Sequence, residues 1–289
     1  MHIHADWNLW PIHFLRKWMG LYLFKGGKSD TKMISIHELS YSFGTLLQAP
    51  VFSGLSLKVQ QGEFVSVVGA SGCGKSTLFK IIAGLLEPAS GEIFMHGKPS
   101  STRTRLGKIA YMPQQDLLLP WRTVLDNCLL PWEVNRVRTK AETITAIRET
   151  LEHFGLAGME NAYPCELSGG MRQRVAFLRT LVTGGDLMLL DEPFGALDAM
   201  TKREMHRWLV ELWGGLGKTV LFITHDLEEA ILLSDRIYVM HNRSPDGFLQ
   251  EMTVDLPRPR RYTMNYEPRF LNLREDLERR LYDTNTNSF

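Results

Sequence analysis

Apolar and polar side chains alternate in two segments near the start of the chain, and a continuous apolar run follows. Residues 34–39 and 55–59 alternate, which is typical of strands with one buried face. Residues 64–69 (FVSVVG) are almost continuously apolar and rich in β-branched side chains, which favours a buried parallel strand. We expect 34–39 to be an edge strand and both alternating segments to belong to an added antiparallel sheet.

Helical and strand-like segments alternate through the middle of the chain. The pattern predicts helices at 78–86, where Pro88 follows, and at 141–154. Short apolar runs predict further buried strands at 187–190, 220–223 and 236–240. Strands that alternate with helices predict an α/β domain on a mainly parallel sheet.

Residues 1–32 have a pattern of their own. Aromatic and apolar side chains recur at helical spacing from Trp7 to Leu21, with Arg16 among them. One interpretation is an amphipathic helix that lies in a membrane interface or packs on a partner. The other is a loosely ordered extension, translated from a start upstream of Met33.

The last part of the chain departs from the α/β pattern at residue 256. A stretch rich in proline and arginine (LPRPRR) favours extended chain, and residues 270–281 have the pattern of a charged helix. Residues 256–289 are therefore predicted to be a C-terminal appendage that lies outside the core.

Composition and charge narrow the class of protein. The chain has 289 residues, of which 22% are charged, and its formal net charge is +1, which gives no basic footprint for nucleic acid. Its 3 cysteines show no CxxC spacing, which predicts a reducing compartment and argues against a zinc site. The sequence has no apolar run long enough to span a bilayer.

A glycine-rich loop after the strand at 64–69 carries the clearest chemistry. Backbone N–H groups in such a loop curl around phosphate, and the following helix N-terminus adds positive partial charge. We expect Lys75 to reach the β- and γ-phosphates of ATP, Ser76 to bind Mg²⁺ and Thr77 to bond on the α-phosphate side. The loop matches GxxxxGK[ST] over Gly69, Ala70, Ser71, Gly72, Cys73, Gly74, Lys75, Ser76 and Thr77.

Two acidic residues end the apolar run at 187–190. Carboxylates at the C-terminal end of a parallel strand lie beside the phosphate loop in a fold of this kind. Asp191 is therefore expected to hold the Mg²⁺ shell, and Glu192 to orient or deprotonate the attacking water.

The segment before that strand reads Leu-Ser-Gly-Gly-Met over residues 167–171, which closely resembles the LSGGQ signature of ATP-binding cassette (ABC) proteins. Met171 stands where the family usually has glutamine. The resemblance implies a P-loop ATPase fold of ABC type over residues 33–255. That fold has a mainly parallel sheet, an added antiparallel β-subdomain and a helical subdomain that carries the signature motif.

Four further residues match motifs of this family in the expected order. Phe43 corresponds to the aromatic residue that stacks on adenine. The alternative interpretation is that Phe43 is an ordinary core side chain. Gln114 corresponds to the Q-loop glutamine, with adjacent Gln115 as an ambiguity. Asp198 corresponds to the D-loop aspartate and His225 to the switch histidine.

The resemblance also implies how the chain assembles. Two copies would enclose two ATP molecules, each between the Lys75 loop of one copy and Ser168, Gly169 and Gly170 of the other. Gln114 would sense Mg²⁺ and pass closure on to transmembrane permease subunits, while His225 would contact the γ-phosphate. The chain would then lie peripherally on the cytoplasmic face of the cell membrane and act indirectly with a periplasmic or extracellular solute-binding protein.

Residues 112–127 resemble the Q-loop region of bacterial importers for nitrate, sulfonates, taurine and thiamine precursors. Their apolar, tryptophan-bearing character suits a socket for a permease helix, or else local packing. The alternatives are a soluble cassette protein acting on ribosomes or DNA, a regulator with an inactive cassette, and the motor of an exporter. The resemblance implies that a separate binding protein and the pore determine which solute is carried.

Overall fold

The computed structural model describes residues 32–44, 50–136, 139–195, 197–216, 218–241 and 249–282. The two interpretations of residues 1–32 therefore concern a segment of which the structure describes only Lys32. Within the described ranges, no helix is both long and apolar enough to cross a membrane.

A 6-stranded sheet forms the centre of the molecule, with strand order β10-β9-β3-β8-β7-β6. Every neighbouring pair is parallel except β9 and β10. The prediction of buried parallel strands is confirmed, because β3, β7 and β8 are buried along almost their whole length. The strands are β3 (Phe64–Gly69), β6 (Ala110–Met112), β7 (Leu187–Asp191), β8 (Thr219–Ile223), β9 (Arg236–Met240) and β10 (Leu249–Thr253).

A second, 4-stranded sheet is antiparallel and has the order β2-β1-β4-β5. The added antiparallel sheet is thus confirmed, but the prediction that residues 34–39 form an edge strand was wrong. β1 lies between β2 and β4. The sequence of β4, SGEIFM, is polar at its start and contains glycine, so it carries no clear strand pattern. The strands are β1 (Lys32–Tyr41), β2 (Phe52–Gln60), β4 (Ser90–Met95) and β5 (Lys98–Pro99).

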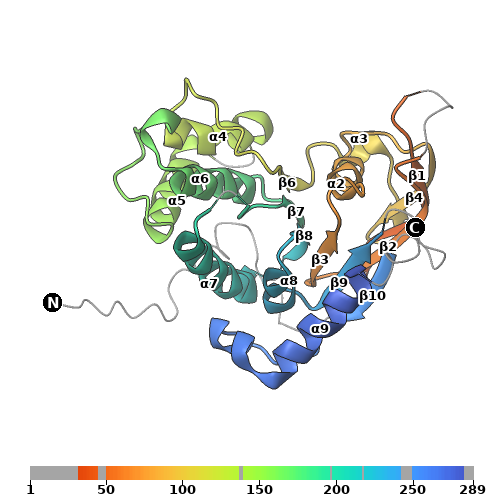
Figure 1. Cartoon of the computed structure of the whole chain (residues 1–289). Helices are drawn as coiled ribbons and strands as arrows, with labels where there is room; N and C mark the ends of the chain where they lie inside the picture. Colours follow the sequence, from red (N-terminus) through yellow and green to blue (C-terminus); the bar gives the residue numbers. More distant parts are fainter. Residues whose placement is uncertain are drawn as a thin grey trace.

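Helices cover the sheets and also form a separate group. α4, α5 and α6 pack on one another on one side of the molecule, and the antiparallel sheet lies on the other side (Figure 1). The helix predicted at 78–86 begins earlier, at Lys75, directly after the phosphate loop. The helices are α2 (Lys75–Ile82), α3 (Thr102–Arg105), α4 (Val124–Asn135), α5 (Lys140–His153), η1 (Pro164–Glu166), α6 (Gly169–Val182), α7 (Ala199–Leu216), α8 (Leu227–Leu233), η2 (Tyr262–Tyr266) and α9 (Pro268–Tyr282).

The C-terminal segment packs against the central sheet and α8. Phe270 and Leu277, on one side of α9, are buried in the same apolar cluster as Val68, Ala230 and Val239. The expectation that residues after 256 lie outside the core was therefore wrong for α9. Because most of α9 is charged or polar, its sequence did not reveal that Phe270 and Leu277 are buried on one side of the helix. The domain boundary at residue 256 stays a prediction.

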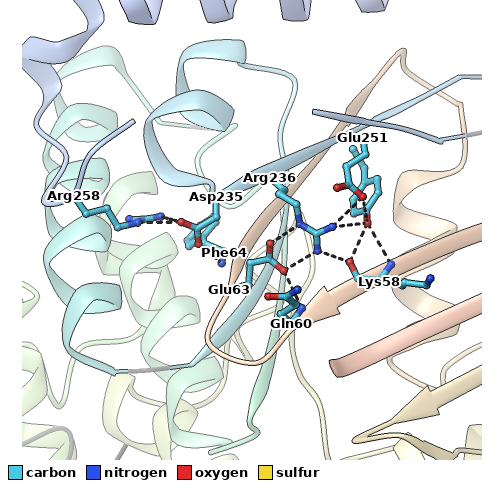
Figure 2. Close-up of polar contacts among 9 residues, drawn as sticks. Lys58, Gln60, Glu63, Phe64, Asp235, Arg236, Glu251 and Arg258 are labelled. Carbon is cyan, nitrogen blue, oxygen red and sulfur yellow. Dashed lines mark hydrogen bonds and ion pairs between the residues drawn. The ribbon is translucent and has the colours of Figure 1, made fainter. Parts of the chain in front are cut away.

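A polar network joins the two sheets (Figure 2). The Arg236 guanidinium on β9 donates to the Glu63 carboxylate at 2.8 Å and to the backbone oxygen of Lys58 on β2 at 2.7 Å. It also lies 2.9 Å from Glu251 on β10. Since Glu63 is buried, this arginine neutralises a charge that would otherwise be costly to desolvate.

Candidate functional site

The phosphate loop connects β3 to α2 through backbone that glycine tolerates. Gly74 precedes the helix with φ 102°, and a Cβ at this position would lie 2.7 Å from a methyl group of Val51. The Lys75 side chain turns back over the loop, and its Nζ donates to the backbone oxygens of Gly69 and Ala70, each at 2.9 Å. The loop thus holds a buried cation at the N-terminus of a helix, where an anion binds favourably.

Ser76 and Asp191 lie together at the end of this loop. The Ser76 hydroxyl donates to Oδ1 of Asp191 at 3.1 Å, and the Tyr111 hydroxyl on β6 donates to Oδ2 at 3.3 Å. Burial raises the pKa of Asp191, the Ser76 hydrogen bond lowers it, and the charge of Glu192 raises it further. A hydroxyl and a carboxylate are the oxygen ligands that Mg²⁺ prefers, so this pair fits the metal.

Glu192 directly follows Asp191, and residues of two other segments contact its carboxylate. Its Oε2 accepts a hydrogen bond from Nε2 of Gln114 at 2.9 Å and lies 3.5 Å from Nδ1 of His225. The backbone of Glu192 has φ 46°, a left-handed conformation that costs a non-glycine residue about 1–3 kcal/mol. Gln114 makes this contact, and its assignment as the Q-loop glutamine stays a prediction.

The residues that match the signature motif lie apart from the phosphate loop. The Ser168 hydroxyl accepts from the backbone N–H of Met171 at 3.2 Å and caps α6, while Ser168 and Gly169 are exposed. A Cβ at Gly170 would lie 3.0 Å from a methyl group of Thr201. Within the described ranges, no hydrogen bond joins these residues to Lys75, and α6 and α2 lie on either side of β6 and β7 (Figure 1).

Asp198 caps the helix that follows β7. Its side chain accepts hydrogen bonds from the backbone of Met200 and from both the backbone and the hydroxyl of Thr201. Hydrogen bonding to Thr201 lowers the pKa of this exposed carboxyl. Neighbouring Ala196 lies outside the described residues.

Phe43 is 52% exposed and packs edge-on against Tyr41, with ring centroids 5.0 Å apart. The alternative of a core side chain is therefore wrong for this residue. An exposed ring of this kind offers a face on which a planar base can stack.

The loop that follows Gln114 is part buried and part exposed. Leu118 is buried, whereas Leu117 is 56% and Trp121 is 71% exposed. Arg179 of α6 anchors the loop, because its guanidinium donates to the backbone oxygens of Asp116 and Leu117 at 2.6 and 2.8 Å. Local packing thus accounts for Leu118 but not for the exposed Trp121 side chain.

Sequence reasoning missed two groups around the site. Tyr111 was not singled out because β6 is only three residues long and has no distinctive pattern. Lys202 on α7 was also missed, although its Nζ lies 2.8 Å from Oδ2 of Asp226, next to His225. Nothing in the spacing of the sequence signals either contact, because both join segments far apart along the chain.

The chain is similar to proteins of one family over most of its length. A family model described as ABC transporter matches residues 52–195. The formylaminopyrimidine import ATP-binding protein ThiZ of Halalkalibacterium halodurans is 43% identical over 247 residues, which cover 85% of this chain and 95% of that protein. The aliphatic sulfonates import ATP-binding protein SsuB 1 of Shouchella clausii is 38% identical over 252 residues, 87% of this chain and 92% of that protein.

A solved structure has the same fold. The ATP-binding cassette MJ0796, in a dimeric post-hydrolysis state bound to ADP and Pi, superposes with a TM-score of 0.69 at 30% identity. The match covers 78% of this chain and 100% of that one.

Proposed function

The chain belongs to the ABC transporter family of ATPases, and from this premise we propose that it is the ATP-hydrolysing subunit of a bacterial importer for a small solute. The observation that carries the proposal is the convergence of Lys75, Ser76 and Asp191 beside the Gln114–Glu192–His225 contact. The named relatives are import ATP-binding proteins, which supports import over export and over a role on ribosomes or DNA.

In the proposed reaction, a water molecule attacks the γ-phosphorus of ATP, and the bond to the β-phosphate oxygen breaks to give ADP and phosphate. Lys75 carries the positive charge for the β- and γ-phosphates. Glu192 accepts the proton of the water or orients it, and His225 contacts the γ-phosphate. Phe43 supplies a face for the adenine ring.

Mg²⁺ is proposed as the metal, held by Ser76, Asp191 and Gln114. When bound, it would neutralise charge on the β- and γ-phosphates. The Ser76–Asp191 hydrogen bond of 3.1 Å places two of its proposed oxygen ligands next to each other.

A second copy of the chain is the proposed partner at the nucleotide. Ser168, Gly169 and Gly170 lie exposed or half-exposed at the N-terminus of α6, and they are free to bind the γ-phosphate held by another copy. The dimeric state of the MJ0796 cassette supports this arrangement. Exposed Asp198 and the start of α7 would lie at the same interface.

Transmembrane permease subunits are the proposed membrane partners, at the cytoplasmic face, with a solute-binding protein acting through them. The proposed contact consists of exposed Trp121 and of exposed Leu117, whose backbone oxygen accepts a hydrogen bond from Arg179 of α6. The solute stays open among nitrate, sulfonates, taurine and a thiamine precursor, because the similar relatives are named for different solutes.

ATP turnover of the purified full chain tests the proposal. We expect Mg²⁺-dependent release of phosphate, and we expect Lys75→Ala to weaken ATP binding about 10–100-fold, because it removes a charged hydrogen-bond donor. Exposed Lys98→Ala on β5 is the matched control and should bind ATP normally. A chain that ignores nucleotide, with its permease present and Mg²⁺ supplied, would refute the proposed function; co-purification with ribosomes or DNA would favour the alternative.

A further inference from the structure

His225 depends on its neighbours for its position. Its side chain is 60% exposed, and its contact to Oε2 of Glu192 is long, at 3.5 Å. A side chain that is exposed on this scale is not fixed by packing. Its placement over a bound γ-phosphate must therefore come from the backbone turn that connects β8 to α8.

Thr224 and Asp226, on either side of His225, shape this turn. The Thr224 hydroxyl is buried against Oε2 of Glu229, and it accepts a hydrogen bond from the backbone N–H of Asp226 at 3.0 Å. Oδ1 of Asp226 caps α8 by accepting from the backbone N–H groups of Glu228 and Glu229, at 2.9 and 3.2 Å. The two residues thus fix the turn through two carboxylates, those of Asp226 and Glu229.

Both carboxylates converge on the ammonium group of Lys202. Its Nζ lies 2.8 Å from Oδ2 of Asp226 and 2.7 Å from Oε1 of Glu229, which is buried and also contacts Nε2 of His206 at 2.9 Å. Burial alone would lower the pKa of Lys202, but its hydrogen bonds to the two acids raise the pKa above its ordinary value. One cation is therefore shared by both acids that shape the His225 turn.

Lys202 comes from the helix that follows Glu192 along the chain. Its backbone N–H donates to the oxygen of Asp198 at 2.9 Å, within the first turn of α7. The lysine is partly accessible, because it lines a cavity of about 310 Å³ between α7, α8 and η2. It thus connects the start of α7 to the turn before α8, which are separated by more than twenty residues of sequence.

We propose that Lys202 is a positioning residue that holds the His225 turn in the geometry needed for hydrolysis, an inference that rests on the proposed role of His225. The lysine touches neither nucleotide nor water in this role. Its loss leaves two neighbouring carboxylates without their shared cation, and the turn between them relaxes. ATP binding at the phosphate loop stays intact, because Lys75 and Ser76 lie on other elements.

The test compares kcat and the KM for ATP in full-length variants. A misplacement of about 1 Å lowers rates by up to about 100-fold, so we expect Lys202→Met to lower kcat by about 10–100-fold with KM within about twofold of wild type. Lys202→Arg keeps the cation and should restore most of kcat. Arg207→Met, which removes an exposed cation from the same helix, is the matched control and should behave as wild type.

The variants separate failure of this inference from failure of the proposed function. An inactive wild-type chain overturns the proposed function, whereas a normal kcat in folded Lys202→Met overturns only the positioning role. A normal kcat in His225→Ala overturns the role of the histidine and this inference with it. If Lys202→Met does not fold, Asp226→Asn replaces it in the test, because asparagine can still cap α8. A lowered kcat at unchanged KM in Asp226→Asn supports the inference. A wild-type kcat in this variant overturns it.

Discussion

Nε2 of Gln114 lies 2.9 Å from Oε2 of Glu192, and the same carboxylate oxygen lies 3.5 Å from Nδ1 of His225. The three residues follow β6, β7 and β8, which are consecutive neighbours in the parallel sheet. Parallel strands bring their carboxyl ends to one edge, so the sheet itself assembles these groups. The proposed hydrolysis follows from this arrangement.

Glu192→Gln is expected to bind ATP and hydrolyse it at least about 100-fold more slowly than wild type. The amide keeps an oxygen for Gln114 but cannot take a proton from water. Because ATP then persists, closed dimers should accumulate, and size-exclusion chromatography with ATP and Mg²⁺ would detect them. Glu152→Gln, at an exposed position of α5, is the control. Near-normal turnover in Glu192→Gln would contradict the role assigned to this carboxylate.

Arg236→Met is expected to lower the free energy of unfolding by about 3 kcal/mol, because buried Glu63 would lose its cation (Figure 2). Chemical denaturation measures the change. Arg274→Met is the comparison, since Arg274 pairs with Glu278 on α9 and with Glu228 on α8, and all three side chains are at least 40% exposed. Each exposed pair should contribute less than about 1 kcal/mol. Equal losses in the two variants would argue against the network as a link between the sheets.

Phe270→Ala is expected to cost about 3–5 kcal/mol, because it leaves a cavity in the cluster between α9, α8 and β9. Leu271→Ala, at the next position of α9, removes a side chain that is 43% exposed and should cost much less. The denaturation midpoints of the two variants measure the difference in stability, provided that the slope of unfolding free energy against denaturant concentration stays constant. If Phe270→Ala unfolds at the wild-type midpoint, the C-terminal helix does not contribute to the core.

The cysteines should differ sharply in reactivity. Burial raises the pKa of Cys128 to about 12, so its thiolate is scarce at pH 8 and grows only as the pH rises toward that value. Cys165 is exposed. An alkylating reagent added to the native protein at pH 8 should therefore modify Cys165 before Cys128, as peptide mass spectrometry would show. Unfolding in denaturant should make the modification rates of Cys165 and Cys128 equal, which serves as the control. Equal rates in the native protein would contradict the burial of Cys128.

Several elements of the fold could be predicted because their signals are local. The sequence pattern predicted the first and last residues of β3 and β9 correctly. The phosphate loop predicted that a helix, α2, follows β3. The position of β1 could not be predicted in the same way. Whether a strand lies at an edge depends on its neighbours, and β4 pairs with β1 from more than fifty residues away.

The sequence alone identified the residues proposed to bind a triphosphate, since a phosphate loop is built from consecutive residues whose glycines and lysine act through the local backbone. Only the tertiary structure decided that Tyr111 meets Asp191, that Gln114 and His225 share one oxygen of Glu192, and that Lys202 contacts Asp226 beside His225. The physical reason is range. Side-chain hydrogen bonds act over about 3 Å, and residues distant in sequence come that close only through the order of the strands and the packing of the helices upon them.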